Sequence, residues 1–147
     1  MKIRISYFYN IRFFKPNQIP VSTALWDPSW FKQLRKDARG VWNGIRLEEL
    51  NPAGLSGYCP SCSEHNGRGC EFLKRYYEKL ERLNFQDIMT SLESIGRGIQ
   101  AYDGFQEDPE IILMVYETPN NPCSERGCLQ DWFMKNGVLL EEWTKDE

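Results

Sequence analysis

Apolar and polar positions alternate at the start of the chain. In residues 2–9, one set of alternate positions is apolar or aromatic and the other is mostly polar, and a period of two predicts a β-strand with one buried face. Short apolar runs at 19–26 and 138–143 predict two further strands. Residues 110–116 (EIILMVY) are apolar at both sets of positions, which predicts a central strand covered on both faces.

Helical spacing marks other segments. Residues 71–83 and 85–95 carry apolar side chains at every third or fourth position, as amphipathic helices do when they pack on a core. Apolar residues at 128–133 share one helical face, and a glycine follows to end that helix. A basic helix is expected over 28–37, because Asp27 is a good N-cap and proline suits the first helical position.

Strands that alternate with helices predict an α/β fold. We expect a single three-layer domain over residues 1–147, in which helices flank a mainly parallel central sheet. Residues 40–70 interrupt the pattern with six glycines, two prolines and three cysteines. Such a long segment without periodicity predicts an insertion loop that something other than a core must order, and metal binding would do so.

Composition and charge narrow the classes of partner. No run approaches the roughly 20 apolar residues of a membrane span, and the N-terminus lacks the apolar core of a signal peptide, so we expect a cytoplasmic protein without a membrane partner. Net charge is −3, but residues 1–50 hold nine Lys and Arg against four Asp and Glu. This basic third predicts either a face for an anionic partner or a solvated face that offsets the acidic remainder. A protein that binds nucleic acid by charge alone would be more basic overall.

The turn after the central strand, YETPNNPCSER (116–126), is the predicted active site. In α/β sheets, ligands bind beyond the carboxyl ends of the strands, where loops lead into helices. Asn121 is expected to cap the next helix and Pro122 to begin it, which puts Cys123 in the first helical turn. Free N–H groups and the helix dipole there favour an anion and lower the pKa of a thiol. The structural alternative is that Cys123 is simply packed and Arg126 is a surface charge.

Further side chains are expected around this site. Arg126 would bind a phosphate or carboxylate through paired N–H donors, and Glu117 would act as a base or bind a ribose hydroxyl. Because the first two strands should end at the same edge, their exits are expected to supply ligand-binding residues, with Tyr7 and Trp30 able to stack a base or sugar. The predicted catalytic residues are Cys123, Arg126 and Glu117, and the predicted ligand-binding residues are Ser6, Tyr7, Asn10, Ser22, Trp30 and Ser124.

The chain resembles the uncharacterised domain of unknown function 488 family, in a cysteine-rich form, from about Ile3 to Trp143. The resemblance rests on ISYFYN, IPVSTALWDPSWF, FLKRYYEKL and ILMVYE, the last followed by a cysteine–arginine turn and a helix bearing Trp132. It implies an α/β fold and a site at this turn, where members commonly carry Cys-His-Arg. Here the stretch is Cys123-Ser124-Glu125-Arg126, without histidine and one residue longer, which speaks against histidine-dependent chemistry.

A second cluster, GYCPSCSEHNGRGCEF, gathers potential metal ligands: Cys59, Cys62, Cys70 and His65, the only histidine. The Cys-x-x-Cys pair lets two thiolates reach one ion, and Cys70 supplies a third. A closed zinc site needs a fourth ligand, either His65 or a cysteine from the later turn, Cys123 or Cys128. Zinc is the expected metal and an iron–sulfur cluster the alternative. Free thiols or a redox pair are the readings without metal.

Three functions fit these features. The first is an enzyme or degenerate enzyme that acts on a nucleotide-like or phosphorylated ligand at 116–126. The second is a nucleic-acid-binding module that uses the basic, Trp-rich segment 26–46, because aromatic rings interleaved with cations suit single strands. The third is a non-catalytic interaction protein with a structural metal. We favour the first because the turn combines an anion-binding position with Arg126 and Glu117. The sequence predicts no oligomeric state.

Overall fold

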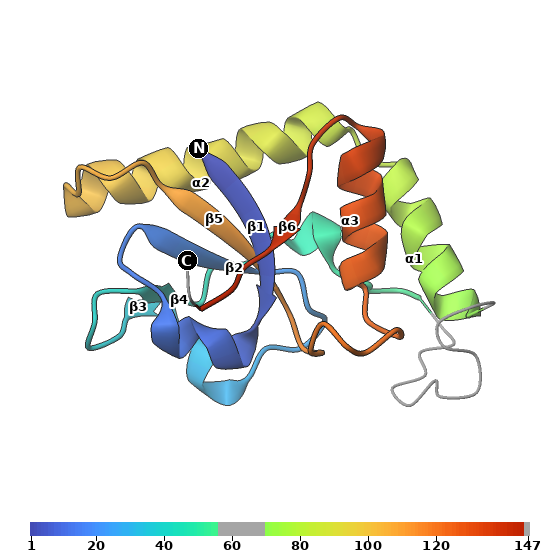
Figure 1. Cartoon of the computed structure of the whole chain (residues 1–147), viewed down its shortest axis with the longest axis horizontal. Helices are drawn as coiled ribbons and strands as arrows, with labels where there is room; N and C mark the ends of the chain where they lie inside the picture. The colour runs from blue at the N-terminus through green and yellow to red at the C-terminus, as the bar shows by residue number, and fades with distance from the viewer. Residues whose placement is uncertain (56–69, 146–147) are drawn as a thin grey trace.

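A parallel four-stranded sheet forms the centre of the computed structural model, which describes residues 1–55 and 70–145 (Figure 1). The strand order is β2-β5-β1-β6, and every pairing in this sheet is parallel. The strands are β1 (Lys2–Tyr7), β2 (Gln18–Ser22), β5 (Glu110–Val115) and β6 (Glu141–Glu142). The predicted α/β fold with a mainly parallel sheet is therefore confirmed.

The central position of β5 explains its continuous apolar run. All six of its residues are buried, and it pairs with β1 on one side and β2 on the other. In register, Ile111 lies between Ile3 and Ile19. A strand buried on both faces cannot alternate apolar with polar residues. The strand predicted at 110–116 is thus confirmed.

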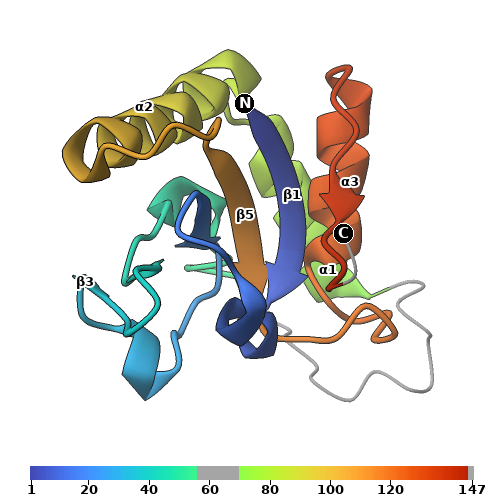
Figure 2. The same cartoon turned by 60° about the vertical axis from the view of Figure 1, so that its left-hand side comes forward.

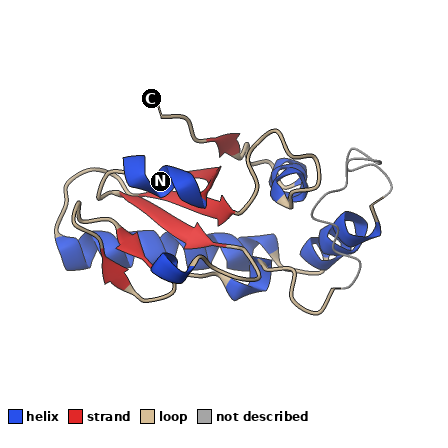
Figure 3. Ribbon diagram, turned by 90° about the horizontal axis from the view of Figure 1, so that it is seen from below, coloured by secondary structure: helices blue, strands red, loops and turns tan. Residues whose placement is uncertain are grey.

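Three α-helices cover one face of the sheet, as Figure 2 shows. They are α1 (Glu71–Glu81), α2 (Phe85–Asp103) and α3 (Arg126–Lys135). Asn84 begins α2, because its side chain accepts a hydrogen bond from the backbone N–H of Asp87 at 3.0 Å. Tyr76, Leu92 and Phe133, one from each helix, are fully buried in the same core as the sheet residues. Figure 3 shows the long helix α2 running along the sheet.

The other face carries no α-helix in the described ranges. Its cover consists of the 3-10 helices η1 (Phe8–Phe13) and η2 (Ser29–Phe31) and an antiparallel hairpin of β3 (Arg35–Lys36) and β4 (Trp42–Asn43). A further 3-10 helix, η3, spans Glu48–Leu50. Ile112 and Met114 of β5 point to this side and pack with a second core made of Phe8, Ile11, Phe14, Phe31, Val41 and Trp143.

The prediction of a helix over 28–37 is wrong. The structure has only η2 there, followed by β3. Asp27 does not cap a helix: it accepts a hydrogen bond from the Ser22 hydroxyl at 2.5 Å and forms an ion pair with Arg46 at 2.6 Å. A partner distant in sequence therefore takes the carboxylate that a helix start would need.

Several predicted bounds also change. The first strand ends at Tyr7 because η1 begins at Phe8, and the second ends at Ser22. The last strand shrinks to Glu141–Glu142, whereas the helix from Phe85 extends to Asp103. Of the predicted insertion loop, residues 56–69 lie outside the described residues. Within the described ranges, no helix combines the length and apolar character that crossing a bilayer needs.

Candidate functional site

The turn at 116–126 does not build the predicted helix start. α3 begins at Arg126 rather than at Pro122, so the placement of Cys123 in the first helical turn is wrong. Two local hydrogen bonds explain the delay: the Asn121 side chain accepts from the Cys123 N–H at 2.9 Å, and the Ser124 hydroxyl accepts from the Arg126 N–H at 3.1 Å. Side chains that bond to nearby backbone in this way compete with helix formation.

The predicted nucleophile is not accessible in this arrangement. Cys123 is 4% exposed and belongs to the buried part of the protein. Reactive cysteines lie in partly exposed, electropositive surroundings. The geometry therefore matches the structural alternative for this thiol.

Arg126 is also turned inward. It is 5% exposed, its Nε donates to Glu142 Oε1 at 2.7 Å, and its Nη1 donates to the carbonyl of Glu117 at 2.8 Å. These bonds join the turn to β6. The remaining nitrogen, Nη2, is buried without a hydrogen-bond partner among the described residues.

A carboxyl pair beside Arg126 was not predicted. Burial, and then the negative charge of Glu117, raise the pKa of Glu125 from 4.5 to about 7, while a hydrogen bond with the Glu117 carboxyl adds to the effect. Arg126 opposes the rise. Groups that titrate near neutrality suit acid–base chemistry, although ion-pair networks also perturb pKa values. The sequence shows Glu125 only as one more charged residue in a polar turn, so no pattern marks it.

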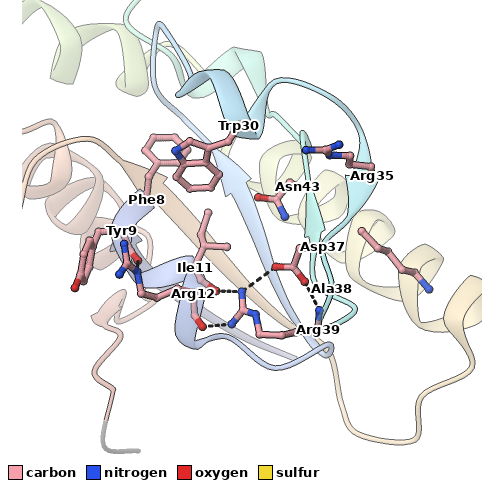
Figure 4. Close-up of a pocket in the computed structure, with 11 residues that line it drawn as sticks. Phe8, Tyr9, Ile11, Arg12, Trp30, Arg35, Asp37, Ala38, Arg39 and Asn43 are labelled. Carbon is pink, nitrogen blue, oxygen red and sulfur yellow. Dashed lines mark hydrogen bonds and ion pairs between the residues drawn. The ribbon is translucent and has the colours of Figure 1, made fainter.

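A cleft of about 600 Å³ lies elsewhere, on the side of the sheet covered by η1 and η2 (Figure 4). Phe8 directly follows β1, and Tyr116 directly follows β5. The centres of their rings lie 5.2 Å apart. The cleft is therefore near the carboxyl ends of the parallel strands, where α/β proteins bind ligands. Its lining consists of Phe8, Tyr9, Ile11, Arg12, Trp30, Arg35, Lys36, Asp37, Ala38, Arg39 and Asn43.

Two of the basic residues in this lining have internal partners. Arg39 donates to Asp37 Oδ2 at 2.8 Å and to the carbonyl of Ile11 at 2.7 Å, which fastens the hairpin to η1. Burial alone would raise the pKa of Asp37, but hydrogen bonds from the Val41 N–H and from Arg39 lower it. Lys36 forms an ion pair with Asp103 at 2.6 Å.

The other two basic residues are available to a ligand. Arg12 donates through Nε to the Tyr9 carbonyl at 3.2 Å, and its guanidinium carbon lies 3.7 Å from the centre of the Tyr9 ring; it forms no ion pair with a described residue. The backbone of Arg35 pairs with Asn43 in the hairpin, but its guanidinium has neither a hydrogen bond nor an ion pair with any described residue. Figure 4 shows Arg12 and Arg35 on opposite sides of the cleft, with Trp30 and Phe8 at one end.

The predicted ligand-binding residues divide between cleft and core. Trp30 lines the cleft and is 49% exposed. Ser6 and Ser22 are fully buried: Ser6 accepts from the Asn10 amide at 2.9 Å, and Ser22 donates to Asp27. Tyr7 stacks on Tyr9, and Ser124 is buried in the turn. Phe8 and Arg12 were not predicted, because the first strand was expected to continue to residue 9 but ends at Tyr7, and the segment after it lines the cleft.

The predicted metal ligands cannot be placed as a set. Cys59, Cys62 and His65 lie outside the described residues, whereas Cys70 precedes α1. Within residues 1–55 and 70–145, no three His, Cys, Asp or Glu side chains are arranged to hold a metal ion.

Comparison with known proteins gives no information about function, so a function has to be inferred from the fold and the cleft. No family model, curated protein or solved structure matches the chain. The resemblance to the domain of unknown function 488 family therefore stays a prediction.

Proposed function

We propose that the protein binds a nucleotide-like, phosphorylated ligand in the cleft, with the base stacked on Trp30 and the phosphate bound by Arg35. The observation that carries this proposal is a half-exposed tryptophan in the same cleft as a guanidinium that has no partner among the described residues. A volume of about 600 Å³ falls in the range of small-molecule sites.

Packing around Trp30 supports a stacking role. Its ring meets Phe8 at 86° and Phe31 at 88°, so both neighbours contact it edge-to-face. Such contacts fix an aromatic ring without covering both of its faces. A ring that is both fixed and half-exposed loses little conformational entropy when a base stacks on it.

Charge in the cleft supports an anionic ligand. Arg12, Arg35, Lys36 and Arg39 contribute positive charge, against the single carboxylate of Asp37. Arg35 can hold a phosphate through paired N–H donors. The proposed activity is binding, because the one carboxylate in the described lining, Asp37, is bonded to Arg39.

Titration with nucleoside mono-, di- and triphosphates, followed by tryptophan fluorescence and calorimetry, tests the proposal. Trp30→Ala should weaken binding by about 5- to 150-fold, since stacking on an aromatic side chain is worth about 1–3 kcal/mol per base. Arg35→Ala should weaken it about tenfold or more, because a charge-assisted hydrogen bond is lost. Arg12→Ala should have a smaller effect.

Two exposed residues outside the cleft lining serve as matched controls. Trp26→Ala removes an indole that is 73% exposed, and Arg82→Ala removes a cation at the end of α1. Both variants should bind nucleotide as the wild type does. Absence of binding across the panel, or equal losses in Trp26→Ala and Trp30→Ala, would contradict the proposed site.

Exposed rings on the segments that follow three of the strands favour single-stranded nucleic acid as a second candidate. Tyr9, Trp26 and Tyr116 are each about half exposed or more, and they lie on the segments that follow β1, β2 and β5. Several such rings could stack successive bases. In that case oligonucleotides would bind more tightly than mononucleotides, with strong salt dependence, and Trp26→Ala would weaken only oligonucleotide binding.

A further inference from the structure

Asn43, in β4, is the buried polar residue of the cleft. Of the polar residues in the described cleft lining, it alone is buried, with 5% of its surface exposed. Figure 4 shows its side chain reaching from β4 toward the cleft. A buried amide in the wall of a ligand site needs a hydrogen-bond partner for each of its polar atoms, and any partner that the protein does not supply can come from a ligand.

The amide of Asn43 has a defined orientation. Its Nδ2 donates to the Val41 carbonyl at 3.2 Å. Because a carbonyl only accepts hydrogen bonds, this contact puts the nitrogen toward Val41 and turns the oxygen, Oδ1, away from it. Oδ1 accepts no hydrogen bond from a described residue, and it is not one of the fully buried atoms that lack a partner. A ligand in the cleft can therefore reach this acceptor.

The hairpin places Asn43 beside the proposed phosphate-binding residue. Arg35 of β3 lies directly opposite Asn43 in the antiparallel pairing, and side chains of directly opposite residues share one face of a hairpin. The next pair, Lys36 and Trp42, directs its polar groups to Asp103 instead, at 2.6 and 3.0 Å. An exposed guanidinium and a buried amide acceptor thus lie next to each other on the cleft side of the hairpin.

We propose that the base of the bound nucleotide is adenine and that Asn43 selects it, by accepting a hydrogen bond from the 6-amino group through Oδ1. The inference rests on the proposed function and adds a base to it. Asparagine pairs with adenine because the amino group of adenine is a donor. Guanine and hypoxanthine carry a carbonyl oxygen at the same position, which would place one acceptor against another.

Other groups in the lining do not compete for this role. Its arginines and its lysine only donate hydrogen bonds, so they suit the phosphate. Asp37, its carboxylate, is bonded to Arg39. The Asn43 oxygen is therefore the acceptor best placed for an uncharged donor of the base. A site built to bond one polar group of a ligand discriminates strongly against an analogue that lacks the group.

Calorimetric titration of the wild type with three nucleoside monophosphates tests the selection. Adenosine, inosine and guanosine monophosphates share the ribose and the phosphate, so differences in their dissociation constants report on the base. Adenosine monophosphate should bind about 5- to 150-fold more tightly than the other two, the discrimination expected of one good base contact. N6,N6-dimethyladenosine monophosphate, which has no N–H at this position, should bind as weakly as inosine monophosphate and needs no protein variant.

Asn43→Ala should bind adenosine and inosine monophosphates with nearly equal affinity. The readout is the ratio of the two dissociation constants, because a purely structural role through the Val41 bond would weaken both ligands equally and leave the ratio unchanged. Asn136→Ala is the matched control. Its amide also donates to a backbone carbonyl, that of Trp132 at 2.8 Å, but it lies at the end of α3 outside the cleft lining, so this variant should keep the wild-type ratio.

The outcomes separate this inference from the proposed function. Equal affinity of the wild type for the three monophosphates, with each weakened in Trp30→Ala, would overturn the role of Asn43 and leave nucleotide binding in the cleft intact. An unchanged preference for adenosine monophosphate in Asn43→Ala would also overturn that role. Absence of binding by every nucleotide would overturn the proposed function and, with it, the selection of adenine.

Discussion

At Glu125, burial and a neighbouring carboxylate create a pH dependence of stability. Its pKa rises from 4.5 to about 7 in the folded protein, so between these values the folded state holds a proton that the unfolded state has released. The free energy of unfolding is therefore not reduced by Glu125 below about pH 4.5, where the carboxyl is protonated in both states. It falls as pH rises through 7, because the buried carboxyl must then ionise. The loss is on the order of 3 kcal/mol, at about 1.4 kcal/mol per pKa unit.

Glu125→Gln should therefore remove part of the pH dependence. Glutamine keeps the shape of the protonated carboxyl, so the variant should gain stability over the wild type at pH 8 and little at pH 4. Urea unfolding at both values measures the difference. Glu93→Gln, on the exposed side of α2, is the control and should change stability equally at both values. A difference between wild type and Glu125→Gln that does not vary with pH would contradict the shift.

Individual side chains show why the site was harder to predict than the fold. The sequence predicted an active site in the 116–126 turn from Cys123, Arg126 and Glu117, and it did not single out Glu125. It could not show that Glu142, sixteen residues later, would take the guanidinium inward. Partners distant in sequence decide whether a charged side chain serves a ligand or the fold, and spacing along the chain does not reveal them.

Among the elements, the β3–β4 hairpin is followed by a glycine, Gly44, at a close backbone contact. Gly44 has φ +94°, and a Cβ there would lie 2.5 Å from the carbonyl oxygen of Gln33. Gly54 has a similar φ of +82°, but a Cβ there would meet no atom of the described residues within 4 Å. Substitutions at these two glycines therefore separate two contributions to the free energy of unfolding: the strain of the left-handed conformation and the clash with nearby backbone.

Gly44→Ala should destabilise the protein more than Gly54→Ala does. Both variants carry the left-handed strain of roughly 1–2 kcal/mol, and Gly44→Ala adds a steric cost of about 1–3 kcal/mol. Urea unfolding measures both variants. Because the hairpin supplies Arg35 to the cleft, Gly44→Ala should also weaken nucleotide binding, whereas Gly54→Ala should not. Equal unfolding midpoints for the two variants would show that the hairpin can shift to accept a side chain.

The predicted elements are correct where the apolar pattern is long. They are wrong where hydrogen bonds of short polar side chains determine the local structure. The helix at Glu71–Glu81 and the strand at Glu110–Val115 follow directly from their periodicity. The segment after Asp27 read as a capped helix, but Ser22 and Arg46 bind that carboxylate. Asn121 and Ser124 misled in the same way, because Asx and Ser turns resemble helix caps in sequence.

At the scale of the whole molecule, the parallel topology joins distant parts of the chain. β1 lies between β5 and β6, so its residues pair with segments that follow it by more than a hundred positions. Alternation of strands and helices predicts that such a sheet forms, but strand order depends on which faces fit together. The position of β2 beside β5, and of β6 at the opposite edge, could not be predicted from local patterns.

Trp143 directly follows β6 and packs in the second core. Its substitution tests how far that core depends on this last segment of the chain. The indole is 5% exposed, its ring lies 4.9 Å from that of Phe14, and its backbone N–H donates to the Ile5 carbonyl at 2.8 Å. Trp143→Ala should cost about 3–5 kcal/mol of unfolding free energy, because it leaves a cavity between η1 and the sheet. Trp26→Ala, which removes the same side chain from an exposed position, should stay within about 0.5 kcal/mol of the wild type. Near-equal urea midpoints for the two variants would mean that the second core is stable without the segment after α3.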